Sequence, residues 1–85
     1  KSELPVTDYR ITAHARSEML HRQISEEEIA VVLAAPGQVE TARQGRSVYQ
    51  SLFQSENSGK TYLVRVFVDI DRVPPEVVTA YRTSK

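Results

Sequence analysis

Apolar residues recur along the chain with two different periods, one in each half. Within residues 12–35 they return every three or four positions, which is typical of an amphipathic helix. Within residues 38–82 they tend to return at every second position, which is typical of a strand with one buried face. The second period is clearest in residues 61–70, where one face carries Tyr62, Val64, Val66, Val68 and Ile70. The pattern therefore predicts helices first and strands afterwards.

Residue types at the expected helix ends support two helices. Thr12 is a typical N-cap, and we expect the first helix to cover residues 13–23. Its apolar positions are few, so this helix should cover the rim of a core. Ser25, followed three residues later by Glu28, forms a capping-box pattern that begins a second helix. Pro36 and the glycine after it end that helix.

Four strands are expected after the helices, separated by short turns. They cover residues 38–42, 46–54, 61–70 and 76–82. Residues 1–11 are expected to form an extended lead-in, and a strand within the first ten residues is the alternative. Helices followed by hairpin-linked strands predict an α+β fold. Two N-terminal helices, residues 12–35, should pack on one face of a four-stranded antiparallel meander sheet, residues 38–82, within a single domain of residues 1–85.

Strand alternation also assigns side chains to the two faces of the sheet. If the helices cover the face of Val64, Arg65 points outward together with Arg46 on a neighbouring strand. On the last strand, Tyr81 is expected on the same face as Val77. Arginines and tyrosines on an open sheet would suit RNA, because guanidinium groups bind phosphates and rings stack on bases. Pairing of Arg65 with a carboxylate across the strands is the structural alternative.

Composition narrows the function classes. The chain has 85 residues, of which 40% are hydrophobic and 26% charged, and it contains no cysteine. Disulfides, thiolate zinc sites and cysteine nucleophiles are therefore excluded, and a reducing cytoplasm fits best. No segment approaches the roughly 20 apolar residues that span a bilayer, and no signal peptide is visible. We expect a cytoplasmic protein with no membrane contact.

Charge is balanced in total but unevenly distributed. The sequence has 11 basic and 11 acidic residues. Residues 25–42 carry four glutamates and no cation, whereas residues 43–85 have a net charge of +3. Eight of the 11 cations are arginine, whose planar donor fork matches phosphate oxygens. A basic face is thus consistent with the sequence, although overall neutrality argues against strong nonspecific binding of nucleic acid.

The sequence contains no motif for a metal or an organic cofactor. His14 and His21 are seven residues apart, too far along one helix to hold a single metal ion. The acidic run Glu26–Glu28 is best explained as favourable charge at a helix N-terminus. Glycine-rich phosphate loops and serine-hydrolase elbows are also absent. We expect neither a metal nor a cofactor.

Several segments together resemble a known family. The stretch His14–Ser25 is followed by a short acidic helix, a Gly45-Arg46 turn, a valine-rich strand and a last strand that ends with Val-Thr-Ala-Tyr, residues 78–81. This pattern is similar to a small prokaryotic domain family of unknown function that looks related to BrnT- and RelE-like ribonuclease toxins. The chain departs from the family pattern at Glu18, where arginine is usual, and at Gln23, where glycine is usual.

The resemblance implies a metal-independent endoribonuclease toxin of a toxin–antitoxin pair, or a relative that has lost this activity. RNA would be its substrate, and a cognate antitoxin protein would be its partner. Such an enzyme needs groups that move protons and cations that bind the phosphate. The implied catalytic residues are His14, Arg22 and Tyr81, with His14 as general base or acid, and the implied substrate-binding residues are Arg46, Arg65 and Arg82.

Each of these residues also has a structural interpretation. His14 could be a capping or packing residue, Arg22 could tie the helix corner to Glu26 or to a carboxylate of the sheet, and Tyr81 could be half-buried with its hydroxyl at the rim. The alternative function is a non-catalytic RNA- or protein-binding module of the same fold. A homodimer formed through a strand edge, with a purely structural role, is a third hypothesis.

Overall fold

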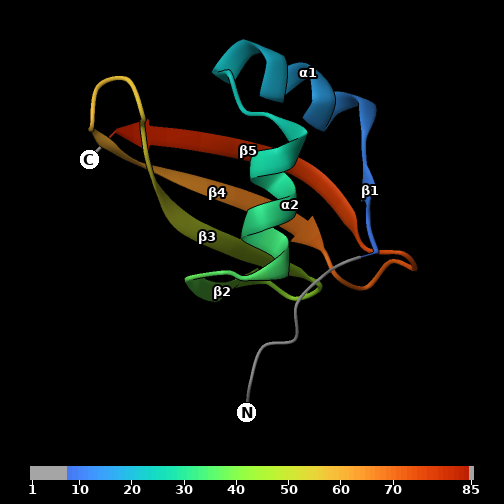
Figure 1. The fold of residues 1–85 in the computed structure, drawn as a ribbon. Coiled ribbons are helices and arrows are strands. Elements are labelled where there is room, and N and C mark those ends of the chain that lie inside the picture. Colours follow the sequence, from blue (N-terminus) through green and yellow to red (C-terminus); the bar gives the residue numbers. More distant parts are fainter. Residues whose placement is uncertain (1–7, 85) are drawn as a thin grey trace.

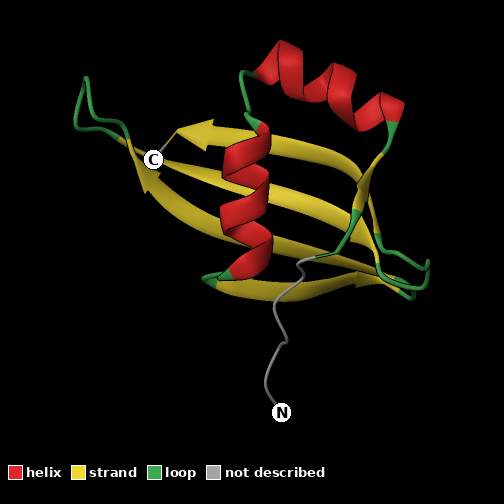
Figure 2. Cartoon of the chain, turned by 45° about the vertical axis from the view of Figure 1, so that its right-hand side comes forward, coloured by secondary structure: helices red, strands yellow, loops and turns green. Residues whose placement is uncertain are grey.

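The computed structural model describes residues 8–84 of the chain. In Figures 1 and 2 both helices lie on the same side of a twisted sheet. In chain order the elements are β1 (Arg10–Ile11), α1 (Ala13–Arg22), α2 (Glu26–Ala34), β2 (Gln38–Arg43), β3 (Arg46–Gln54), β4 (Thr61–Asp69) and β5 (Glu76–Ser84). The predicted α+β class is therefore confirmed.

The prediction of a four-stranded antiparallel meander is wrong, because the sheet is five-stranded and mixed. Its strand order is β1-β5-β4-β3-β2, and β1 runs parallel to β5. The main chain of Arg10 and Thr12 donates hydrogen bonds to the carbonyl oxygens of Pro75 and Val77, at 2.8 and 3.1 Å. A strand of two residues has no side-chain period, so its pairing could not be foreseen. The expected lead-in at residues 1–7 lies outside the described residues.

The helix ends follow the sequence signals. The Thr12 hydroxyl accepts a hydrogen bond from the Ala15 main chain at 3.1 Å, and Ser25 with Glu28 forms the predicted capping box. α1 ends at Arg22, and its C-cap residue, Gln23, takes a left-handed conformation with φ of 59°. Among residues 8–84, no helix has the length and apolar character that a membrane crossing requires.

The core lies between the helices and one face of the sheet. α2 packs across β3 and β4, and α1 packs along β5 (Figure 2). Fully buried side chains come from both layers: Ala15, Ile29, Val32, Leu33, Val64, Val66, Val68, Val77 and Ala80. Among the described elements, none covers the opposite face of the sheet, which carries Arg65, Phe67 and Tyr81. We call it the open face.

A β-bulge in β5 changes the assignment of one side chain. Val68 lies opposite Val77, whereas Phe67 lies opposite Thr79, so one extra residue of β5 falls between these pairs. Val77 is therefore fully buried under the helices, while Tyr81 is on the open face. The expectation that these two residues share a face is wrong, because strict alternation fails across a bulge.

Candidate functional site: the open face of the sheet

Four polar side chains form a continuous row across the open face. The strand register places Gln38 beside Gln50, Gln50 beside Arg65, and Arg65 beside Tyr81. Arg65 Nε donates a hydrogen bond to Gln50 Oε1 at 3.1 Å, and Gln50 Nε2 donates to Gln38 Oε1 at 3.3 Å. Gln38 Nε2 in turn donates to Glu40 at 2.6 Å. We call Gln38, Gln50, Arg65 and Tyr81 the open-face row.

Aromatic rings and guanidinium groups meet at the β5 end of this row. Tyr81 is 41% exposed, and its ring meets the Phe67 ring edge to face, with 5.5 Å between centroids. The Arg22 guanidinium lies 4.4 Å from the Tyr81 centroid, and the Arg65 guanidinium lies 5.6 Å from the Phe67 centroid. Both pairs are within the range of cation–π attraction. Three of the predicted site residues, Arg22, Arg65 and Tyr81, are thus brought together.

Arg22 reaches this cluster because α1 runs along the edge of β5. Its Nη1 atom donates a hydrogen bond to the main-chain carbonyl of Ala80 at 3.2 Å. It also forms an ion pair with Glu18, one helical turn earlier. Arg22 therefore ties the helix to the sheet, through a carbonyl oxygen and not through Glu26 or a carboxylate of the sheet. Its charge is already compensated by Glu18.

Arg65 is in a different electrostatic position. Its side chain is half-buried in the middle of the sheet, and its partners are the Gln50 amide oxygen and the Phe67 ring. Within residues 8–84, no carboxylate lies within ion-pair distance of it, whereas Arg10, Arg16, Arg22 and Arg46 each have one. A partly desolvated guanidinium without a counter-charge favours binding of an anion.

Neither histidine joins this cluster. His14 is exposed in the first turn of α1, eight residues before Arg22. At 1.5 Å per residue, the two positions are about 12 Å apart along the helix axis. His21 is also exposed. Within the described part of the chain, no three histidine, aspartate or glutamate side chains gather where they could hold a metal ion.

The other two predicted cations lie elsewhere. Arg46 is at the far end of the open face, where its Nε atom is 2.6 Å from Asp69 Oδ1. This hydrogen-bonded pair lowers the pKa of Asp69 and raises the pKa of Arg46. Arg82 is on the helix side, with its guanidinium 4.0 Å from the Tyr62 ring centroid and 3.0 Å from the Gln23 carbonyl oxygen. Both arginines are held by neighbours outside the open-face row.

Sequence reasoning missed Gln38, Gln50 and Phe67. Alternation along β4 places Phe67 on the face of Arg65, so this residue could have been found from the strand pattern. The two glutamines carry no such signal. They join the site only because the registers of three strands align them with Arg65.

A hollow of about 440 Å³ adjoins the row at the β2 edge of the sheet. We call it the edge hollow. Two residues of the row, Gln38 and Gln50, line it, and the apolar side chains of Leu52 and Leu63 add to its walls. Gly37 and Ser51 complete the lining. The open face therefore combines a cation, an exposed ring and a partly apolar hollow.

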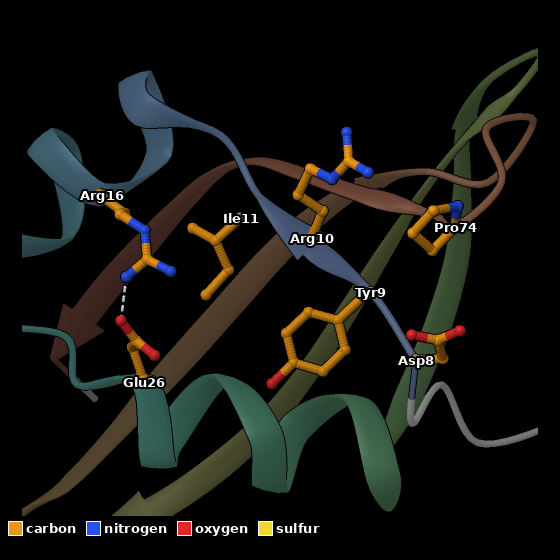
Figure 3. A pocket seen from close by; sticks show the side chains of 7 residues that line it. All are labelled: Asp8, Tyr9, Arg10, Ile11, Arg16, Glu26 and Pro74. Atoms are coloured by element: carbon orange, nitrogen blue, oxygen red, sulfur yellow. Dashed lines mark hydrogen bonds and ion pairs between the residues drawn. The ribbon is translucent and has the colours of Figure 1, made fainter.

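A second pocket, of about 460 Å³, lies on the helix side, between β1 and the N-terminal end of α2 (Figure 3). Tyr9 and Ile11 point into it, and Arg16 meets Glu26 across it. Arg10, the other cation in its lining, is 3.8 Å from Glu76. Because both cations have carboxylate partners, this pocket lacks the uncompensated charge of Arg65. The open face is the stronger candidate.

The sequence was also compared with known proteins. A protein-family profile described as "Domain of unknown function (DUF4258)" matches residues 11–82. The chain belongs to this family. No curated protein and no solved structure matches this DUF4258 domain. The expected relationship to BrnT- and RelE-like toxins is not part of what the family description states, and it stays a prediction.

Proposed function

We propose that the open face of this DUF4258 domain binds single-stranded RNA. The observation that carries the proposal is Arg65, a half-buried guanidinium without a carboxylate partner among residues 8–84, at the centre of the open face. Phosphate, like carboxylate, has oxygens whose geometry matches the arginine fork. A backbone phosphate placed there would receive a charge-assisted hydrogen bond in partly desolvated surroundings.

The rings beside Arg65 support a nucleic acid over a simple anion. Tyr81 is exposed and held in place by Phe67 and Arg22, so it is a preorganised surface on which a base can stack. A base inside a duplex is already stacked on both faces and cannot use this ring. The combination of an anion site and a stacking ring therefore favours an unpaired strand.

The test is a binding titration with a short, fluorescently labelled single-stranded RNA, followed by fluorescence anisotropy. Arg65→Gln removes the central charge and should weaken binding roughly tenfold to a hundredfold, the range for loss of a charge-assisted hydrogen bond. Arg72→Gln makes the same charge change in the exposed loop between β4 and β5, and it should leave the affinity nearly unchanged. Equal losses in the two variants would contradict the proposal.

Salt dependence gives a second readout of the same contact. Each phosphate neutralised on a single strand contributes a slope of about −0.7 to log K against log salt concentration. Arg65→Gln should therefore reduce the magnitude of the slope by about 0.7. An unchanged slope would show that Arg65 contacts no phosphate.

Metal-independent RNA cleavage is the second candidate function. Tyr81 favours it, because this exposed phenol lies beside Arg65, so a proton donor and a cation without a carboxylate partner among residues 8–84 are adjacent. His14 is a helix length away from this centre. Tyr81→Phe keeps the stacking ring and removes the hydroxyl, so it should retain RNA binding and abolish any cleavage seen in the presence of a metal chelator.

The toxin interpretation adds a cellular expectation to this second candidate. Induced expression of the chain should arrest growth, and a cognate antitoxin that covers the open face should relieve the arrest. Tyr81→Phe and Arg65→Gln should each allow growth at equal protein levels. If growth arrest persists in both variants, the open face does not cause the toxicity.

A further inference from the structure

The edge hollow exists because the sheet has a step at this edge. β3 extends to Gln54, but β2 pairs with it only as far as Gln50. Within residues 8–84, the last four residues of β3 therefore have no neighbouring strand on that side. The hollow opens at this step, and its volume of about 440 Å³ is within the range of small-ligand sites.

The lining of the edge hollow fits a planar group with apolar faces and a polar rim. Leu52, which is 59% exposed, and Leu63 provide the apolar walls. Gln38 and Gln50 each use one amide hydrogen and one oxygen lone pair in hydrogen bonds to each other, to Arg65 or to Glu40. An amide carries two of each, so each glutamine keeps a donor and an acceptor for a ligand. A nucleobase has this combination of faces and edges.

Arg65 lies between this hollow and the stacking ring. Gln50 is its cross-strand neighbour on one side and Tyr81 on the other. We propose that the domain holds one dinucleotide step with its two bases splayed apart, an inference that rests on the proposed RNA binding at the open face. The phosphate between the two nucleotides binds Arg65, one base enters the edge hollow, and the other stacks on Tyr81.

The strand spacing requires that the two bases be unstacked. Neighbouring strands are about 4.8 Å apart, so Gln50 and Tyr81 are separated by about 10 Å across Arg65. Stacked bases are only about 3.4 Å apart. A step that occupies both subsites is therefore opened to about three times its stacked separation. Binding of this kind selects an unpaired strand and straightens the backbone at the phosphate on Arg65.

The experiment uses the intact chain and a short single-stranded RNA that contains two adjacent 2-aminopurine bases. The fluorescence of these bases is quenched while they stack on each other and rises when they separate. Anisotropy of a dye at the end of the same RNA reports binding independently. We expect the 2-aminopurine fluorescence to increase severalfold as the anisotropy reaches saturation.

Two matched variants locate the effect. Leu52→Ser removes an apolar wall of the hollow, and it should lower the fluorescence gain at saturation to about half or less, because apolar contact with the base is lost. Val31→Ser removes a similarly exposed apolar side chain, 52% accessible, from the outer surface of α2, and it should change nothing. A full fluorescence gain in Leu52→Ser would overturn the proposed role of the hollow.

The two readouts separate this inference from the proposed function. If the anisotropy saturates without a fluorescence gain, RNA binds with its bases stacked, and the splayed dinucleotide is wrong while RNA binding at the open face stands. If the anisotropy does not change at all, RNA binding itself is wrong, and the inference fails with it.

Discussion

The guanidinium of Arg22 lies 4.4 Å from the centroid of the Tyr81 ring and donates a hydrogen bond to the carbonyl oxygen of the preceding residue, Ala80. One side chain of α1 thus satisfies an edge carbonyl of β5 and orients an exposed ring on the open face. β1 covers only the first two residues of β5, so Arg22 protects a later part of the same edge. The packing of α1 against β5 and the orientation of Tyr81 in the candidate site therefore depend on the same side chain, Arg22.

Replacing Arg22 should destabilise the fold. Arg22→Met keeps most of the side-chain length but loses the hydrogen bond to Ala80 and the pairing with Glu18, so we expect the free energy of unfolding to fall by about 2 kcal/mol. Arg16→Met breaks the more exposed ion pair with Glu26 and should cost at most about 1 kcal/mol. Urea denaturation followed by circular dichroism measures both. A larger loss in Arg16→Met would contradict the role given to Arg22.

The end of α1 offers a stabilising substitution. Gln23 has a φ of 59°, in the left-handed region that glycine adopts without strain. Gln23→Gly should raise the free energy of unfolding by about 0.5–1 kcal/mol. The hydrogen bond from Arg82 goes to the carbonyl oxygen of Gln23 and is kept.

Ser17→Gly is the matched control for Gln23→Gly. Ser17 is exposed and lies inside α1, where glycine should lower the free energy of unfolding by about 0.5 kcal/mol. Thermal unfolding of both variants beside the unmodified chain is sufficient to compare them. Destabilisation by both substitutions would show that the left-handed conformation of Gln23 carries no strain.

The ion pair between Arg46 and Asp69 predicts that the free energy of unfolding depends on pH in the acid range. The hydrogen bond from Arg46 lowers the pKa of Asp69, so the ionised carboxylate is favoured in the folded chain. The stabilisation is complete above the ordinary aspartate pKa of about 3.9 and is lost as the pH falls through the lowered value. Asp69→Asn should therefore unfold more easily than the unmodified chain at neutral pH, and the difference should shrink in acid.

Glu56→Gln, in the exposed β3–β4 loop, is the control for Asp69→Asn and should show neither effect. Urea unfolding at a series of pH values measures the two differences. A gap between Asp69→Asn and the unmodified chain that widens as the pH falls would contradict the sign of the argument.

His14 gives a prediction of no effect. It is exposed, and it lies about 12 Å along the helix axis from Arg22. His14→Ala should leave RNA affinity within about twofold of the unmodified chain and change the free energy of unfolding by less than about 0.5 kcal/mol. The same anisotropy titration checks it. A large loss of affinity would place the RNA along α1 and away from the sheet.

Local signals in the sequence predicted much of the fold. Thr12 and the Ser25–Glu28 capping box mark the starts of the two helices, and each signal involves residues no more than three positions apart. The third predicted strand, residues 61–70, agrees with β4 to within one residue. These features depend on neighbouring residues only. Parallel pairing of Arg10–Ile11 with β5 is set by distant main-chain groups, and the sequence therefore gave no indication of it.

The candidate site was only partly predictable for the same reason. Arg65 and its outward direction follow from alternation along one strand. The meeting of Arg22 with Tyr81 depends on how α1 lies on β5 and on a bulge that shifts the faces of that strand. The position of Gln50 beside Arg65 depends on a register between two strands. A register and a helix docking angle are properties of the whole fold.

An NMR titration of the isotopically labelled chain with short single-stranded RNA tests the central claim most directly. Binding at the open face predicts that the largest shifts occur at the Arg65 guanidinium, the Tyr81 ring and the Gln50 side-chain amide, while signals of the buried α2 residues Val32 and Leu33 barely move. Shifts confined to the helix layer, or no shifts at RNA concentrations that saturate other single-strand binders, would contradict the account.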